Sequence, residues 1–387
     1  MNLTQNFKST VNVLFELWRD AVENDRIPQT VTLLGSPGIG KTSAARALGK
    51  RMTEYMRQKG ADRDAVCEVR DLSSSLPEDL GGLPYRDGDT TRYAPQSMIR
   101  NVCDEEAYGV LVLDDLPAAS TAVQVASRQI SLEHRVHDHH ISKRVMVIVT
   151  GNRKEDKSAA ATLPAHFRNS VLMLTVEPSF DGWEEWYFDS GLDSLIPQFL
   201  RFRPNYFSML PKDADGNGSF ATPRTWAMLA NALNVAKKTD TLYAVASGLV
   251  GEGVTKELVA FDMLKSQLVS PDKVLADPQG ALPDRSVLNG PDRMIAMVCG
   301  LADAAIIKAA DTKVKGNLAY VQYLCALAYV TETNREYVAT SISTFTAHKG
   351  NFRKLLDSVP EARAKEPRVA AMLAKLAECF QSTNGSK

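Results

Sequence analysis

The stretch Val31-Thr-Leu-Leu-Gly-Ser-Pro-Gly-Ile-Gly-Lys-Thr42 joins a short apolar run to a glycine-rich loop. From Gly35 to Thr42 it has the spacing G-x-x-x-x-G-K-[ST], which is typical of a loop that binds phosphate groups. The apolar run predicts a strand, and residues 43–50 predict the opening of a helix. Backbone N–H groups in such a loop converge on phosphate oxygens, and the helix N-terminus adds its dipole. The stretch therefore predicts an α/β nucleotide-binding domain.

The loop also supplies side chains for a nucleotide and its metal ion. Lys41 provides a positive charge for the β and γ phosphates, and the hydroxyl of Thr42 provides a ligand for Mg²⁺. The cofactors that we expect are therefore ATP and Mg²⁺. The residues expected to line the nucleotide site are Gly35, Pro37, Gly38, Ile39, Gly40, Lys41, Thr42 and Ser43.

The composition limits the class of protein. With 387 residues, of which 44% are hydrophobic and 24% charged, the chain is long enough for two or three domains. The net charge of −1 argues against a large nucleic-acid surface. The five cysteines are scattered and include no C-x-x-C pair, which favours reduced thiols over disulfides or zinc. Because no apolar run has membrane-spanning length and the N-terminus lacks a signal-peptide core, we expect a cytoplasmic protein without a membrane partner.

Five short apolar segments predict the strands of a parallel sheet. They are residues 31–34, 66–69, 109–113, 145–150 and 171–176, with helical stretches between several of them and a further helix expected over 7–25. Such alternation is typical of a parallel sheet covered by helices on both faces. Ligands of these sheets bind at the carboxyl ends of the strands, where the phosphate loop, Asp114 and Asn152 all fall. We therefore expect these residues to form one site.

Beyond residue 176 the pattern changes to helices and loops. Residues 270–292 are rich in Pro, Asp and Gly, and we interpret them as a linker or long loop. Helical periodicity then resumes over residues 293–377. The expected domains are a nucleotide-binding core with an N-terminal helix at 1–176, a helical lid at 177–269 and a C-terminal helical domain for partner binding at 286–387.

Two adjacent carboxylates follow the apolar strand of residues 110–113, in the form of a Walker B strand. Asp114 stands where such a strand delivers a carboxylate beside Mg²⁺, and Asp115 stands where an acid can polarise the attacking water. The alternative is a solvated turn at the end of a strand. Because a phosphate loop precedes them in the chain, we assign Asp114 to the metal ion and Asp115 to the base.

Three further residues are candidates for catalysis. Asn152 follows an apolar strand, where its amide can orient water against the γ-phosphate; the alternative is a residue that caps a turn. Arg224 is expected in the first turn of a helix, from which it either reaches the γ-phosphate or points to solvent. Arg168 can enter the site of a neighbouring subunit, a role that Arg153 could also fill, or it is a surface charge.

The order of these motifs resembles that of AAA+ ATPases, in particular the MoxR-type branch that also includes dynein-related and McrB-type modules. The resemblance covers residues 25–260, and the ordered set is much more specific than the phosphate loop alone. The matching segments are 35–42, Leu113-Asp-Asp-Leu-Pro117, Thr150-Gly-Asn-Arg153, Leu163-Pro-Ala-His-Phe-Arg-Asn169 and Thr222-Pro-Arg224, with further similarity at 80–84, 122–124 and 131–136.

The resemblance implies a core of αβα layers with a five-stranded parallel sheet, followed by a helical lid. It also implies a ring, usually a hexamer, with ATP between subunits. Asn152 would then take the sensor-1 role and Arg224 the sensor-2 role, while Arg168 would reach the neighbouring site. Members of this branch commonly act as chaperones that remodel protein partners, often beside a protein with a von Willebrand factor A domain.

Two departures from the family pattern bear on function. The family usually has Asp-Glu where this chain has Asp114-Asp115. Because aspartate is shorter than glutamate, the alternative to an active motor is a protein that hydrolyses ATP slowly, or an assembly switch controlled by nucleotide binding. The usual order Asn-Arg-Phe appears as Phe167-Arg168-Asn169, which shifts the arginine by one position. A nucleic-acid translocase of McrB-like type, or a helicase loader, is a further alternative that the near-neutral charge disfavours.

Two segments between the motifs carry hypotheses of their own. Residues 80–93 predict a hairpin that turns at Asp87-Gly-Asp89. Leu83 and Tyr85 could grip a substrate in a ring pore, and the alternative is a plain surface hairpin. The second segment, residues 134–140, contains four histidines: His134, His137, His139 and His140. They lack the helical spacing of metal ligands, and we expect them to be solvated.

Overall fold

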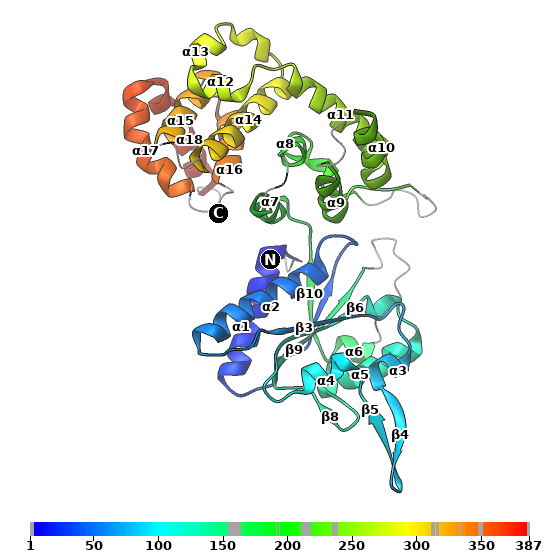
Figure 1. Ribbon diagram of the computed structural model, residues 1–387. Coiled ribbons are helices and arrows are strands. Elements are labelled where there is room, and N and C mark those ends of the chain that lie inside the picture. Colours follow the sequence, from blue (N-terminus) through cyan, green and yellow to red (C-terminus); the bar gives the residue numbers. More distant parts are fainter. Residues whose placement is uncertain are drawn as a thin grey trace. The chain divides into compact units, whose positions relative to one another are not determined.

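The computed structural model describes residues 4–153, 163, 165–190, 192, 194–209, 218–233, 239–310, 314, 317–332, 334–346 and 351–384. The chain forms two compact units. The first contains the chain up to Gly182 together with Thr222–Arg224, and the second contains most of the chain from Trp183 onward. Figure 1 shows the sheet of the first unit and the helices of the second. Among the described helices, none is long and apolar enough to span a lipid bilayer.

A parallel sheet forms the centre of the first unit, with the strand order β1-β10-β2-β9-β6-β3. The strands are β1 (Thr4–Gln5), β2 (Val31–Leu34), β3 (Val66–Asp71), β6 (Tyr108–Asp114), β9 (Arg144–Gly151) and β10 (Leu172–Val176). The five longer strands confirm the five-stranded parallel sheet expected from the sequence. The two-residue β1 extends the sheet beyond β10.

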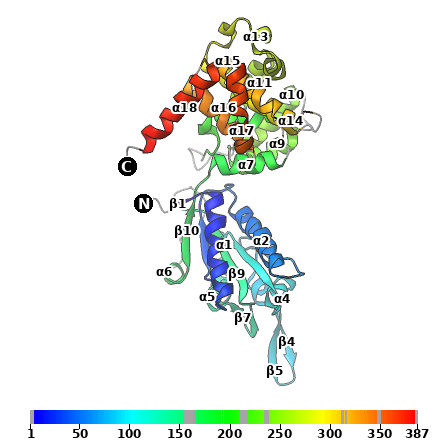
Figure 2. The ribbon, with the colours of Figure 1, turned by 90° about the vertical axis from the view of Figure 1, so that its left-hand side faces the viewer.

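Helices cover both faces of the sheet (Figures 1 and 2). One layer contains α1 (Phe7–Glu23) and α2 (Lys41–Gln58); the other contains α4 (Ser97–Cys103) and α5 (Thr121–Glu133), and the unit also holds α3 (Pro77–Gly81) and α6 (Ala165–Arg168). In β6, Val110 and Val112 join the core under α1 and α2, whereas Leu111 and Leu113 join the opposite core. Successive strand residues point to opposite faces, so a continuous apolar strand gives a sheet buried on both sides.

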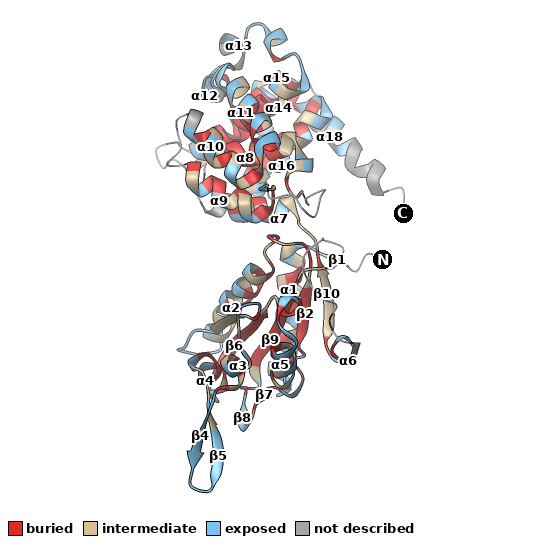
Figure 3. Cartoon of the chain, turned by 90° about the vertical axis from the view of Figure 1, so that its right-hand side faces the viewer, coloured by how far each residue is buried: buried red, intermediate tan, exposed pale blue. Residues whose placement is uncertain are grey.

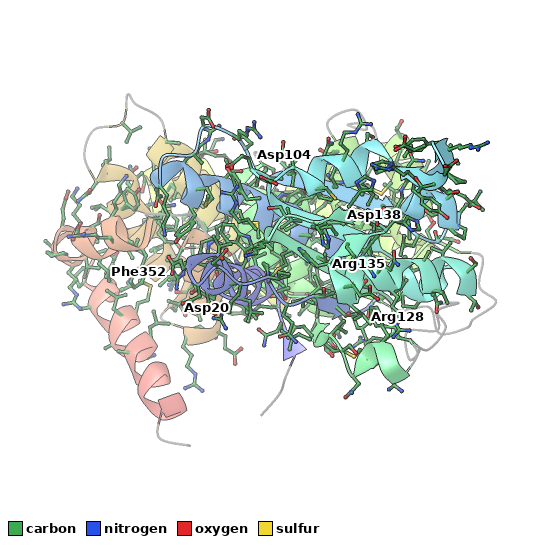
Figure 4. All side chains as sticks on the ribbon, turned by 90° about the horizontal axis from the view of Figure 1, so that it is seen from below. Asp20, Asp104, Arg128, Arg135, Asp138 and Phe352 are labelled. Atoms are coloured by element: carbon green, nitrogen blue, oxygen red, sulfur yellow. The ribbon has the colours of Figure 1, made fainter. Side chains whose placement is uncertain are left out.

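Two short hairpins project from the first unit. β4 (Leu83–Asp87) pairs with β5 (Thr90–Ala94) in antiparallel register, which confirms the hairpin predicted from the sequence. Nearly all of its residues are exposed (Figure 3). The second hairpin joins β7 (Arg135–Val136) to β8 (His139–His140), and Arg135 and Asp138 mark it in Figure 4.

Histidines connect the two hairpins. The ring of His137 stacks on Tyr93 with the ring centroids 3.8 Å apart, and Nε2 of His139 lies 3.1 Å from the carbonyl oxygen of Tyr93. His134 is buried, and its Nε2 lies 3.1 Å from the carbonyl oxygen of Ser142. Within the described part of the chain, no group of three or more His, Cys, Asp or Glu side chains is arranged to hold a metal ion. The expectation that all four histidines are solvated is wrong for His134, because its side chain is buried against the carbonyl oxygen of Ser142.

The helices from residue 180 to the C-terminus are α7 (Phe180–Asp189), α8 (Leu195–Phe202), α9 (Pro223–Leu233), α10 (Thr239–Val250), α11 (Glu252–Ser266), α12 (Pro271–Ala276), α13 (Pro278–Ala281), α14 (Pro291–Ala310), α15 (Leu318–Thr331), α16 (Arg335–Thr346), α17 (Asn351–Lys365) and α18 (Arg368–Asn384). Helix α15 is buried on nearly all sides and supplies much of the core of the second unit. Its apolar residues follow one another almost without interruption, which is the pattern of a fully enclosed helix.

The segment of residues 270–292 is more regular than the sequence analysis expected. It contains the short helices α12 and α13, and each has a proline in its first turn. Proline is favourable there because the first N–H groups of a helix have no partner within the helix. Helices on either side of this segment, α8 and α11 before it and α14 after it, contact one another within the second unit.

Candidate active site

The predicted phosphate loop connects β2 to α2 at the carboxyl end of the sheet. Lys41 is the first residue of α2, and Gly40 precedes it with φ of 97°, a backbone conformation that side-chain-bearing residues rarely adopt. A Cβ atom at Gly35 would lie only 2.4 Å from the carbonyl oxygen of Val176, the last residue of β10. The glycines are therefore needed both for the turn and for the close approach of neighbouring strands.

Lys41 is almost fully buried beneath the loop, with 9% of its surface exposed. Its Nζ donates hydrogen bonds to the carbonyl oxygens of Gly35 at 2.8 Å and Ser36 at 2.9 Å, and to Oδ1 of Asn152 at 2.9 Å. Asn152 lies directly after β9, the strand beside β2. The structure thus brings together two residues that the sequence separates by 111 positions.

Thr42 and Asp114 meet at the end of β6. The hydroxyl of Thr42 donates to Oδ1 of Asp114 at 2.9 Å and to Oδ2 at 3.0 Å. A hydroxyl and a carboxylate are oxygen ligands of the kind that Mg²⁺ prefers, and Mg²⁺ commonly binds with few protein ligands plus phosphates and water. The donor set therefore fits the metal ion predicted from the sequence.

Thr150, which the sequence analysis did not select, connects the two aspartates. Its hydroxyl donates to Oδ1 of Asp114 and accepts a hydrogen bond of 3.1 Å from the backbone N–H of Asp115. The residue is buried near the end of β9, directly after the apolar run of residues 145–149. A polar residue at that position is the sequence signal that could have identified it.

Asp115 adopts a left-handed backbone conformation, with φ of 57°. Its Oδ1 is buried and has no hydrogen-bond partner among the described residues. Burial raises the pKa of this carboxyl, the neighbouring charge of Asp114 raises it further, and the charge of Lys41 opposes the change. A carboxylate with an unsatisfied oxygen and a raised pKa is suited to accept a proton.

The arginines predicted from the sequence lie in three different settings. Arg224 is the second residue of α9. Its backbone N–H donates to the carbonyl oxygen of Gly38 at 3.0 Å, while its side chain is exposed. Arg168 is exposed at the end of α6 and makes no ion pair with any residue that the structure describes. Arg153 is half-buried; its Nη1 pairs with Glu177, and its Nη2 donates to Oγ of Ser36 at 3.1 Å.

Residues 31–173 match the family model described as "ATPase family associated with various cellular activities (AAA)". This segment runs from β2 into β10 and includes Lys41, Thr42, Asp114, Asp115 and Asn152. No curated protein matches the chain.

One solved structure with a similar arrangement is the Thermotoga maritima RuvB Holliday junction branch migration motor. The two sequences are 14% identical, the match covers 71% of this chain and 76% of the RuvB chain, and the TM-score is 0.36. Another is the Aeropyrum pernix ORC2 protein, with 12% identity, coverage of 92% and 93%, and a TM-score of 0.37. At these values the similarity carries no conclusion about function.

Proposed function

We propose that the AAA domain of residues 31–173 binds ATP with Mg²⁺ and hydrolyses it to ADP and phosphate. The observation that carries this proposal is the convergence of Lys41, Thr42, Asp114, Asp115 and Asn152 at the carboxyl ends of β2, β6 and β9. Positioning and charge stabilisation supply most of the catalysis of phosphoryl transfer, and these residues provide both.

Each residue has a distinct part in this proposal. Lys41 binds the β and γ phosphates, and Thr42 and Asp114 hold Mg²⁺, which would neutralise the charge of the phosphates. Asp115 accepts a proton from a water molecule that Asn152 orients. The water oxygen forms a bond to the γ-phosphorus while the bond to the bridging oxygen breaks, so that ADP and phosphate are released.

We further propose a cytoplasmic ring, a hexamer of the MoxR type, that remodels a protein partner as a chaperone. In the ring Arg168 would serve the neighbouring subunit, because Arg153 is engaged within its own chain, and Arg224 would act in its own site. The client, such as a protein with a von Willebrand factor A domain, would bind in the pore of the ring or through the C-terminal helical domain of residues 286–387. The order of the motifs in the sequence supports this finer assignment.

The first test compares steady-state ATP hydrolysis by the wild type and by Lys41→Ala. We expect turnover to fall by about 100-fold or more, because the buried ammonium that contacts the phosphates is lost. Lys50→Ala is the matched control, since Lys50 is exposed on the same helix. Light scattering with and without ATP reports whether a ring forms; a chain that stays monomeric and binds no ATP would refute the proposal.

One observation favours a second candidate, a switch in which ATP binding rather than turnover drives assembly. The acid at position 115 is an aspartate, one methylene shorter than glutamate, and a displacement of about 1 Å can reduce a rate on the order of 100-fold. ATP-dependent assembly with negligible hydrolysis would support the switch over the motor. A nucleic-acid translocase or helicase loader would instead show DNA-stimulated hydrolysis with strong salt dependence.

A further inference from the structure

Arg153 spans the ends of three neighbouring strands. In the register of the sheet, Leu34 of β2 lies opposite Gly151 of β9 on one side and Thr175 of β10 on the other. The residues that follow these strands therefore lie side by side. From the end of β9, the guanidinium of Arg153 reaches Ser36 after β2 and Glu177 after β10.

We propose that Arg153 is a positioning residue that fixes the start of the phosphate loop within its own subunit. This inference rests on the ATP-binding function proposed above and extends it to a residue outside the loop. Ser36 is the link: its hydroxyl accepts from Arg153 at 3.1 Å, and its carbonyl oxygen accepts from Nζ of Lys41 at 2.9 Å. Holding Ser36 therefore also holds one of the acceptors that orient Lys41.

The partners of Arg153 are themselves anchored. Ser36 is 5% exposed, and the preceding Gly35 N–H donates to the carbonyl oxygen of Gly151 at 3.3 Å. The backbone N–H of Glu177 donates to the carbonyl oxygen of Gln5 at 2.9 Å, which ties it to β1. Arg153, with 23% of its side chain exposed, thus connects two points whose backbones are already fixed.

The guanidinium is specifically suited to this contact. It presents several N–H groups in a fixed plane, so that one nitrogen can donate to a hydroxyl while another pairs with a carboxylate. The ammonium of a lysine is a single point charge on a flexible stem and would not hold both acceptors in the same way. We therefore expect Arg153→Lys to keep the charge and lose the positioning effect.

A residue that positions the loop equally before and during the reaction changes binding more than turnover. We expect Arg153→Gln and Arg153→Lys to weaken the binding of a slowly hydrolysed ATP analogue with Mg²⁺ by about 10-fold, and to raise KM for ATP while kcat changes by less than about threefold. Binding is measured by titration of the full chain at protein concentrations where light scattering shows the monomer, so that any neighbouring subunit is absent.

Arg144 provides the matched control, because it lies at the opposite end of β9 and pairs with Glu106 at 3.1 Å. Arg144→Gln should leave the affinity for the analogue unchanged. Glu177→Gln should weaken binding in the same direction as Arg153→Gln. The double variant should bind no more weakly than Arg153→Gln alone, since Arg153→Gln already removes the ion pair with Glu177. Ser36→Ala removes only a hydroxyl, and it tests the contact between Arg153 and Ser36 if the arginine variants do not fold.

The outcomes separate this inference from the proposed function. If the wild type binds the analogue and Arg153→Gln and Ser36→Ala bind it equally well, the positioning role is wrong and the ATPase proposal stands. If Arg153→Gln keeps its affinity but loses turnover by about 1,000-fold in the assembled protein, Arg153 is the arginine that acts on the neighbouring site. If the wild type binds no nucleotide, both proposals fail.

Discussion

Asp115 is the residue on which the rate of the proposed reaction depends most directly. Asp115→Asn keeps the shape of the side chain but cannot accept a proton, so we expect kcat to fall by about 100-fold or more while the nucleotide still binds. Asp115→Glu extends the carboxylate by one methylene and should raise kcat if the short acid limits hydrolysis. Steady-state kinetics with parallel binding titrations check both expectations.

The exposed Asp104, labelled in Figure 4, gives a control for these variants. It pairs with Arg63 at 3.3 Å on the surface, and Asp104→Asn should leave kcat unchanged. An unchanged rate in Asp115→Glu would remove the argument that the short acid slows the proposed hydrolysis. The pH dependence is also informative: because burial raises the pKa of Asp115 in the free protein, kcat/KM should begin to fall on acidification at a pH above the ordinary aspartate value of 3.8.

At the scale of a single element, the end of β9 organises both aspartates through Thr150. Thr150→Val preserves the shape of the side chain but removes the hydroxyl. The partly buried N–H of Asp115 then loses its acceptor, and Asp114 keeps the hydrogen bonds from Thr42. We expect the free energy of unfolding to fall by about 1–3 kcal/mol and kcat to fall with it. Urea unfolding and ATPase assays measure the two effects.

Thr150→Ser is the matched control because it retains the hydroxyl, and it should keep most of the activity. Equal losses in the serine and valine variants would mean that packing of the methyl group, rather than the hydrogen bonds, matters at this position. The strand itself should form in both variants, since its neighbours Ile148 and Val149 remain buried in the sheet.

At the scale of the whole molecule, the second unit contains a buried carboxyl whose protonation affects stability. Asp303 on α14 accepts a hydrogen bond from Gln198 on α8. Burial raises the pKa of Asp303 to about 6, and this hydrogen bond opposes the change. Because the folded protein binds this proton more tightly than the unfolded chain, the contribution to stability is present below about pH 4 and is lost as the pH rises through about 6.

Asp303→Asn should therefore raise the free energy of unfolding of the second unit at pH 8, by up to about 3 kcal/mol, and should have little effect at pH 4. The new amide is neutral at both pH values and can donate to Oε1 of Gln198, which is buried without a partner among the described residues. Thermal unfolding at the two pH values measures the difference. Asp357 is exposed on α17, and Asp357→Asn should not change the free energy of unfolding at either pH. If Asp303→Asn lowered the free energy of unfolding at pH 8, the link between protonation and stability would be contradicted.

The amino-acid sequence by itself determined the motifs that consist of residues close together in the chain. The phosphate loop lies between an apolar strand and a helix. Asp114 ends one apolar strand and Asn152 directly follows another, so each could be selected as a candidate within a few residues. Their convergence also followed from the sequence, because parallel strands bring their carboxyl ends to the same edge of a sheet.

Only the tertiary structure decided which of these residues touch. Lys41 reaches Asn152, Arg153 reaches Ser36 and Glu177, and Thr150 joins the two aspartates because β2 lies between β9 and β10 and β9 lies beside β6. The contact of Gln198 with Asp303, 105 positions apart, likewise depends on how helices pack. Apolar periodicity determines which face of an element is buried, whereas the choice of neighbour depends on side-chain packing and strand order across the whole domain.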